Sequence, residues 1–383
     1  MTETSAAAAE LGGLLARIHS SPVQLVLEFT GAGSQALAWL HSIGGSSRTV
    51  IEASDRYAPA SLISVTGFAP ERFTSAEVSR ALAAAAYRRA KALAPDGTPV
   101  IGIGSSSTIA TDRTKRGDHR TITALHGPFG SNTFELTLEK GERDRAGEEE
   151  LVSRLILLAI TDGSGLMQRP HIPLLGTEAI SESFEPAPGF RPFSEGEVPA
   201  ALLTKSGTPT TAPLGEPMVL LSGSFNPVHE GHLGLAAAAE ARLGRPVTFE
   251  LPLVNADKPG LDLLQAQRRA AQFHGRSPVL LSRAPLFVEK ARLFPGSTFI
   301  IGADTAARLL DPRFYPDADG VGGALDELAS LSASFVVAGR SRSGGDFVTL
   351  DGLTIPAGHA DMFTGIDFRL DVSSTELRER RAA

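Results

Sequence analysis

Two histidines three residues apart follow a short apolar run in the second half of the chain. Val219–Leu221 predicts a buried strand, a Gly/Ser/Asn/Pro turn follows it, and the Ala- and Leu-rich run 233–243 predicts a helix. Such a unit points backbone N–H groups and the positive end of a helix dipole at one spot, which suits phosphate. The imidazoles of His229 and His232 add hydrogen-bond donors without permanent charge. The segment therefore predicts a site where the α-phosphate of a nucleoside triphosphate is attacked.

A second polar segment, Ser373-Ser374-Thr375-Glu376-Leu377-Arg378, lies near the C-terminus. Together with the segment 222–232, in this order and at this separation, it resembles the nucleotidyltransferase superfamily with the H-x-G-H and S-S-T-x-x-R motifs. The G-S-F-N-P-x-H form looks most like nicotinamide (or nicotinate) mononucleotide adenylyltransferases. The resemblance covers roughly residues 217–380 and implies adenylyl transfer from ATP to the mononucleotide, giving NAD or deamido-NAD and pyrophosphate.

The resemblance also implies roles for individual residues. His229, His232 and Arg378 are the expected catalytic residues, with His232 donating to the α-phosphate in the transition state. Gly223, Ser224 and Phe225 are expected to offer backbone amides to phosphate, and Gly231 to let the adenine approach. The β- and γ-phosphates are expected on Ser373, Ser374, Thr375 and Arg378, with ATP as co-substrate and Mg²⁺ as cofactor. Because a phosphate monoester is already ionised at neutral pH, no general base is required.

Five further residues are expected to contact the nucleotides. Asp304, in a G-x-D-like segment after an apolar run, is expected at ATP; a helix N-cap is the alternative. Lys258 and Arg340 are candidates for the acceptor phosphate, with a surface position as the alternative for Lys258. Asn226 is expected at the substrate, and Tyr315 (or Phe314 before it) is a candidate to stack on the pyridine ring, because the single Trp of the chain lies at position 39.

Predicted strands and helices alternate in the part of the chain that carries these residues. From residue 219 to 338 short apolar runs typical of strands alternate with helical runs, which predicts a doubly wound, Rossmann-like parallel sheet with helices on both faces. Ligands of such sheets bind at the carboxyl ends of the strands, where the strand order reverses. Most of the candidate residues follow such ends.

The first half also reads as an α/β domain, and it resembles, more distantly, the C-terminal domain of CinA, the nicotinamide mononucleotide amidohydrolase family. The anchors are the segments 27–33 and 102–104, and the resemblance covers about residues 8–160. That family pairs a serine with a lysine. Here Phe29 follows Glu28, and the segment 52–59 has no lysine, so a degenerate domain is expected.

Length and composition bound the remaining possibilities. The 383 residues favour two domains: 1–163, a Pro/Gly-rich connection 164–216, and 217–383. A net charge of −7 gives no basic field for nucleic acid, and the absence of cysteine excludes disulfides and thiolate sites. No apolar run is long enough for a membrane span, and a cytoplasmic protein acting on a small mononucleotide, with homo-oligomers possible, is expected.

Two other functions fit the same motifs. One is a cytidylyltransferase-like enzyme with another acceptor phosphate, because base choice lies in backbone contacts that the sequence does not reveal. The other is a non-catalytic pyridine-nucleotide sensor, against which the intact His229, His232 and Arg378 argue.

Overall fold

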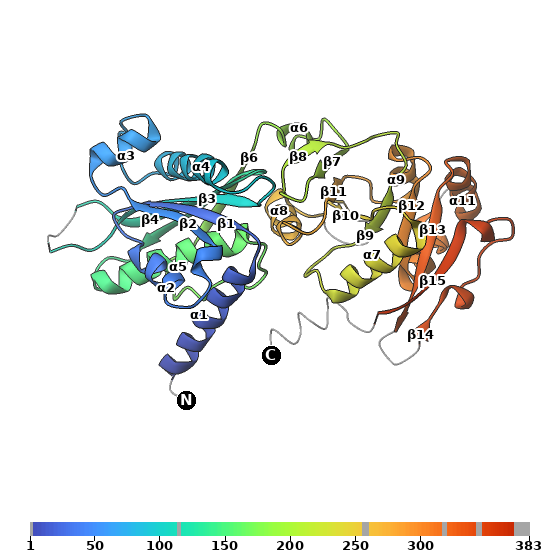
Figure 1. Ribbon diagram of the computed structural model, residues 1–383, viewed down its shortest axis with the longest axis horizontal. Helices are drawn as coiled ribbons and strands as arrows, with labels where there is room; N and C mark the ends of the chain where they lie inside the picture. The colour runs from blue at the N-terminus through green and yellow to red at the C-terminus, as the bar shows by residue number, and fades with distance from the viewer. Residues whose placement is uncertain (1–2, 113–115, 255–259, 316–319, 342–346, 371–383) are drawn as a thin grey trace. The chain divides into compact units, whose positions relative to one another are not determined.

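The computed structural model describes residues 3–112, 116–254, 260–315, 320–341 and 347–370. They form two compact units, each an α/β structure around its own sheet (Figure 1). Unit 1 comprises residues 1–194, 205–209 and 270–276, and unit 2 comprises the rest. The predicted two-domain α/β fold is confirmed.

Unit 1 has a six-stranded sheet in the order β2-β1-β3-β4-β5-β6, parallel between β2, β1 and β3 and antiparallel from β3 onward. The strands are β1 Gln24–Thr30, β2 Val50–Asp55, β3 Val100–Thr108, β4 His119–Gly127, β5 Gly130–Leu138 and β6 Ser181–Pro186. The helices are α1 Glu3–Ser20, α2 Ser34–His41, α3 Pro59–Thr66, α4 Ala76–Leu93, α5 Arg145–Gly163 and α6 Arg191–Ser194, with a 3₁₀ turn at Ser46–Arg48.

The main core of unit 1 lies between its sheet and α1, α2 and α5, and α4 covers the opposite face (Figure 1). Gly102 and Gly104 on β3 allow that close approach. A Cβ atom at Gly102 would lie 2.2 Å from the carbonyl oxygen of Ala83, and one at Gly104 would lie 2.3 Å from the amide of the same residue. Any side chain at these positions would push α4 away from the sheet.

Unit 2 has a nine-stranded sheet in the order β14-β13-β12-β9-β10-β11-β7-β8, with β15 also paired to β13. Its strands are β7 Ala200–Leu203, β8 Pro209–Thr211, β9 Val219–Ser222, β10 Thr248–Pro252, β11 Val279–Ser282, β12 Thr298–Gly302, β13 Ser334–Ser341, β14 Phe347–Val348 and β15 Phe363–Leu370. Its helices are α7 Glu230–Leu243, α8 Leu263–Ala271, α9 Phe287–Leu293, α10 Ala303–Leu309 and α11 Gly320–Ser330, with 3₁₀ turns at Pro312–Phe314, Leu350–Gly352 and Ala360–Met362.

The five central strands of unit 2 are all parallel, and numbered along the chain from β9 they lie in the order 3-2-1-4-5. This is the doubly wound topology that the alternation predicted. The order reverses at β9, whose carboxyl end leads into the histidine motif. Side chains of α9, α10 and α11 pack over one face of this sheet.

The segment 164–216, predicted as a connection, supplies strands to both sheets. It contributes β6 to the edge of the first sheet, and β7 and β8 to the second, where β7 runs antiparallel to β11. Residues 170–175 form no strand. In the described part of the chain, no helix combines the length and the apolar character needed to cross a membrane.

Candidate functional site

The loop between β9 and α7 is shaped by a buried aromatic ring. Phe225 adopts a left-handed backbone conformation (φ 42°), is 1% exposed, and packs edge-on against Phe249 with ring centroids 5.5 Å apart. A Cβ atom at Gly223 would lie 2.7 Å from the Phe225 ring, so glycine fits there without moving the ring. The Asn226–Pro227 peptide bond is cis. The buried ring of Phe225 and the glycine at position 223 together determine the path of the loop.

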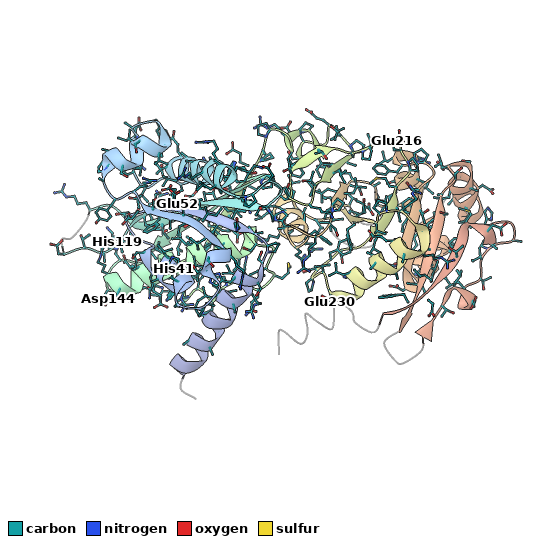
Figure 2. All side chains as sticks on the ribbon, in the orientation of Figure 1. His41, Glu52, His119, Asp144, Glu216 and Glu230 are labelled. Atoms are coloured by element: carbon teal, nitrogen blue, oxygen red, sulfur yellow. The ribbon has the colours of Figure 1, made fainter. Side chains whose placement is uncertain are left out.

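The two histidines of the motif lie at the start of α7. The helix begins at Glu230, which Figure 2 labels. His229 is the N-cap residue, Gly231 is the second residue of the helix and His232 the third. The amide of His229 donates to Nδ1 of His232 at 3.3 Å, and the rings stack with centroids 3.8 Å apart. The side chain of His232 therefore also helps to cap the helix.

This cap has a chemical consequence for His232. Because Nδ1 accepts a hydrogen bond, a neutral His232 carries its proton on Nε2. Protonation of Nδ1 would break the bond to the His229 amide. The ring of His232 also packs edge-on against Phe225, with centroids 5.1 Å apart. The fold thus holds one imidazole as an Nε2–H donor at a helix N-terminus, where anions are stabilised.

One predicted donor needs correction. The amide of Gly223 donates to the carbonyl oxygen of Glu250 at 3.0 Å, because it continues the pairing between β9 and β10. That amide is engaged in the sheet rather than presented to a phosphate. The amide roles of Ser224 and Phe225 stay predictions. The guanidinium of Arg269, on α8, donates to the carbonyl oxygen of Ser224 at 3.0 Å, which brings a cation to the loop that the sequence had not singled out.

The neighbouring strands bring two more candidates to the same edge of the sheet. β12 pairs with β9, and β13 with β12, all parallel, so their carboxyl ends lie together. Asp304 is the second residue of α10, directly after β12, and the N-cap of this helix is Gly302, so the N-cap alternative for Asp304 is wrong. Arg340 lies near the end of β13, two residues past the partner of Gly302.

Tyr315 follows the turn Pro312–Phe314 and packs against the core of unit 2. Burial raises the pKa of its hydroxyl. Its expected stacking on a pyridine ring stays a prediction. Lys258, Ser373, Ser374, Thr375 and Arg378 lie outside the described residues. Within the described ranges, no group of three or more acidic or histidine side chains is arranged to hold a metal ion.

A buried ion pair next to the loop escaped the sequence analysis. The carboxylate of Glu250 on β10 lies 2.6 Å from Nζ of Lys290 on α9, and both side chains are almost completely buried. The hydroxyls of Ser222 and Ser282 donate to the same carboxylate. A glutamate inside a mostly apolar strand, residues 247–253, is the signal that could have indicated this ion pair.

The corresponding strand ends of unit 1 are occupied by internal ion pairs. Glu28 receives two hydrogen bonds from the guanidinium of Arg56, at 2.6 and 3.0 Å, and its side chain is 4% exposed. Those hydrogen bonds raise the pKa of Arg56. Phe29, where the family has its serine, is buried. The arrangement offers a neutralised pair rather than a serine beside a lysine.

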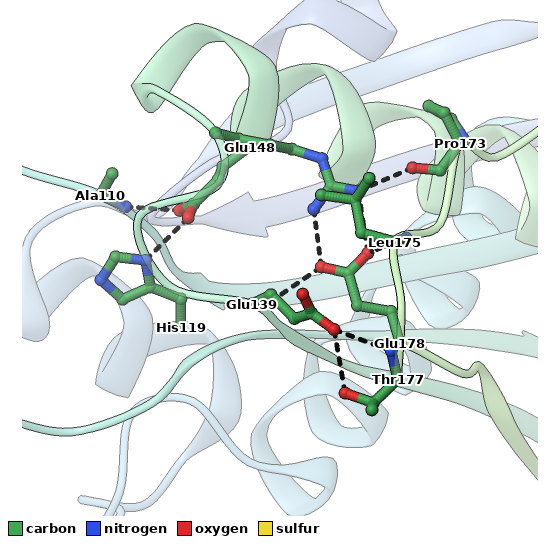
Figure 3. A network of polar contacts seen from close by, with 9 residues as sticks. Ala110, His119, Glu139, Glu148, Pro173, Leu175, Thr177 and Glu178 are labelled. Carbon is green, nitrogen blue, oxygen red and sulfur yellow. Dashed lines mark hydrogen bonds and ion pairs between the residues drawn. The ribbon is translucent and has the colours of Figure 1, made fainter.

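Two neighbouring glutamates of α5 also form hydrogen bonds inside unit 1. Glu149 on α5 accepts hydrogen bonds from the amides of Gly33 and Gln35 and from the Ser34 hydroxyl, at 2.9–3.1 Å, and so covers the N-terminus of α2. The neighbouring Glu148 is fully buried and binds Nδ1 of His119 at 2.8 Å and the amide of Ala110 at 2.6 Å (Figure 3). Each carboxylate has its partners within unit 1.

Comparison with known proteins gives names that agree with both resemblances. The chain is 28% identical over 115 residues to a Schizosaccharomyces pombe protein named "Putative nicotinamide mononucleotide adenylyltransferase"; the match covers 27% of this chain and 45% of that protein, less than half its length. No protein-family model matches the chain.

Solved structures of the CinA superfamily also align with the chain. A protein from Escherichia coli is 13% identical, with a TM-score of 0.33, over 42% of this chain and 91% of that one. One from Agrobacterium tumefaciens is 17% identical, with a TM-score of 0.31, over 39% and 95%. The two-domain α/β fold rests on the topology described above rather than on these low-scoring alignments.

Proposed function

We propose that unit 2 is a nucleotidyltransferase that transfers the adenylyl group of ATP to nicotinamide (or nicotinate) mononucleotide. The observation that carries the proposal is the histidine pair at the N-terminus of α7, placed at the reversal point of a 3-2-1-4-5 sheet with His232 held as an Nε2–H donor. The relative named for this activity supports the choice of acceptor.

The chemistry needs positioning and charge stabilisation. An ionised oxygen of the mononucleotide phosphate attacks the α-phosphorus of ATP, and the bond to the bridging oxygen of pyrophosphate breaks with its electron pair leaving on that oxygen. The Nε2–H of His232 donates to a non-bridging α-phosphate oxygen as charge gathers there. Mg²⁺ bound to the triphosphate would supply positive charge for the departing oxygens. Asp304 directly follows β12 and Arg340 lies near the end of β13 at the same edge of the sheet, and Arg269 donates to the loop carbonyl of Ser224.

We infer that unit 1 does not hydrolyse amides by a serine–lysine mechanism. The positions that would carry such a pair hold Phe29, which is buried, and the ion pair of Glu28 with Arg56. The hydroxyl of Ser34, directly after the segment 27–33, donates to Glu149 at 3.0 Å. We therefore propose that unit 1 has a regulatory or structural role.

A product assay on the purified chain tests both proposals. The protein is incubated with Mg²⁺, ATP or CTP, and nicotinamide or nicotinate mononucleotide, and the products are separated by chromatography. NAD or deamido-NAD with ATP is the expected result. Products with CTP would favour the cytidylyltransferase alternative, whereas binding without any product would favour a sensor. Release of nicotinate mononucleotide from the amide form would overturn the inference about unit 1.

A further inference from the structure

The buried ion pair of Glu250 and Lys290 adjoins the loop assigned to the triphosphate. The Glu250 side chain is 0% exposed and that of Lys290 is 4% exposed, with 2.6 Å between the charged atoms. The hydroxyls of Ser222 and Ser282 add hydrogen bonds to the two carboxylate oxygens. Glu250 is therefore a fully satisfied buried anion, and Lys290 is the ion-pair partner that the structure gives it.

This anion holds the strand from which the loop starts. Ser222 is the last residue of β9, and its hydroxyl donates to Oε2 of Glu250. The next amide, that of Gly223, donates to the backbone carbonyl of the same glutamate at 3.0 Å. Nζ of Lys290 also lies 3.4 Å from Oγ of Ser222. Side-chain and main-chain groups of one residue thus fix the point where the loop leaves the sheet.

A carboxylate in this place creates an electrostatic problem for the proposed function. A nucleoside triphosphate carries several negative charges, and charges act over longer distances in a protein interior than in water. An uncompensated Glu250 would repel the phosphates from a position beside Ser222, the last residue before the loop. A neutral side chain at Lys290 would leave that repulsion in place, whereas an ammonium group cancels it.

We propose that Lys290 is a positioning residue for the triphosphate site, which neutralises the anchoring carboxylate of Glu250 so that the loop is held firmly without repelling phosphate. This inference rests on the proposed nucleotidyltransferase function of unit 2. It predicts that the two partners of one ion pair have opposite effects on anion binding. A purely structural pair would give the same effect from either side.

The test measures the binding of Mg²⁺-ATP and of inorganic tripolyphosphate to the full chain by calorimetry, together with the melting temperature. Lys290→Met leaves a buried negative charge, and we expect about tenfold weaker binding of both probes. Glu250→Gln leaves the positive charge without its counter-ion, and both probes are expected to bind more tightly than to the wild type. Both variants lose the same ion pair and both should melt at a lower temperature. Arg292→Met removes an exposed charge from the same helix as a control, because Arg292 pairs with Glu327 near the surface.

The double variant Glu250→Gln/Lys290→Met carries neither charge of the ion pair. Its affinity for both probes should return to within about twofold of that of the wild type. If Lys290→Met does not fold, Glu250→Gln is compared with the double variant, which isolates the lysine charge; equal affinities would overturn the inference. Equal weakening by both single variants would overturn it too. A wild-type chain that binds neither probe would instead remove the proposed function, on which the inference depends.

Discussion

His232 combines two tasks in one imidazole, because Nδ1 serves the helix cap and Nε2 carries the proton that faces away from it. Two substitutions separate these tasks. Asparagine retains an acceptor near the place of Nδ1 and lacks the distal donor. Glutamine reaches as far as Nε2 with an amide donor and loses the acceptor next to the backbone. The ring of His232 is therefore expected to matter for chemistry more than for stability.

His232→Asn should lower turnover by about 10²–10³-fold, as the loss of one transition-state donor does in other enzymes. Its melting temperature should stay close to that of the wild type. His232→Gln should retain more activity but lose about 0.5–2 kcal/mol of stability with the cap. Steady-state kinetics and thermal unfolding measure the two effects. A His232→Asn variant with normal turnover would remove His232 from the mechanism.

A second histidine, His274 of unit 1, sets a pH dependence of stability. It stacks on Phe129 with centroids 6.1 Å apart, and neither ring nitrogen has a hydrogen-bond partner among the described residues. Complete burial lowers the pKa of His274 from 6.5 to about 4. The unfolded chain takes up its proton near pH 6.5 and the folded chain only near pH 4, so the protein loses stability as the pH falls between these values.

His274→Leu should therefore reduce the loss of stability on acidification. Between the two pKa values of His274, the free energy of unfolding falls by about 3 kcal/mol in total as the pH falls. Above the ordinary histidine pKa there is no such loss. Melting temperatures of the wild type and variant at pH 7.5 and 5.0 measure the effect. His171→Gln, at an exposed position, is the control and should retain the wild-type pH response. Burial also lowers the pKa of His19 and His126, so part of the response persists in the variant. An unchanged slope in His274→Leu would contradict the assignment.

Among the helices, α2 depends on a carboxylate from another helix. Its N-cap is Gly33, which has no side chain to cap it, and Glu149 of α5 receives the amides of Gly33 and Gln35 instead. Glu149→Ala should destabilise unit 1 by about 1–3 kcal/mol, because these two amides and the hydroxyl of Ser34 lose their acceptor. The single tryptophan, Trp39, lies in α2, so its fluorescence during denaturant unfolding reports the change.

The adjacent Glu150 provides the matched control. It pairs with Arg154 four residues along the same helix, and its side chain is 41% exposed. Glu150→Ala should cost no more than about 0.5 kcal/mol, as exposed pairs of this spacing do. Equal losses for the two variants would show that α5 itself, rather than the cap on α2, responds to substitution.

The sequence correctly predicted those strands and helices that can be recognised from the pattern of their own residues. The central strands β9, β10 and β11 are short apolar runs between helical runs, and their parallel order followed from that alternation. Strands β7 and β8 at one end of the sheet and β14 and β15 at the other were missed. β7 and β8 lie in a Pro- and Gly-rich segment, β14 has only two residues, and β7 and β15 depend on pairing partners that are distant in the sequence. The same holds for the pair of Glu250 and Lys290, which are 40 residues apart and meet only in the folded sheet.

At the scale of the whole molecule, the chain does not divide at one point. Residues 205–209 and 270–276 belong to unit 1 although their neighbours in sequence belong to unit 2. The amide of Gly275 donates to the carbonyl of Lys205 at 2.7 Å within unit 1. A boundary at residue 217, predicted from the start of the motif domain, falls after β7 and β8, which pair into the second sheet.

Two fragments test that boundary, one spanning residues 195–383 and one spanning residues 217–383. Both lack residues 1–194 of unit 1. The longer fragment keeps β7, β8 and Lys205, the partner of Gly275, and the shorter one lacks all three. β7 pairs with β11 along four residues, and its Ala200 and Leu203 are buried. Without β7, β11 becomes an exposed apolar edge, and such edges promote association between chains. The shorter fragment should therefore melt lower and aggregate more in sedimentation velocity experiments than the longer one. Equal melting temperatures and monodispersity would place the boundary of the folded unit at residue 217 and make β7 and β8 dispensable.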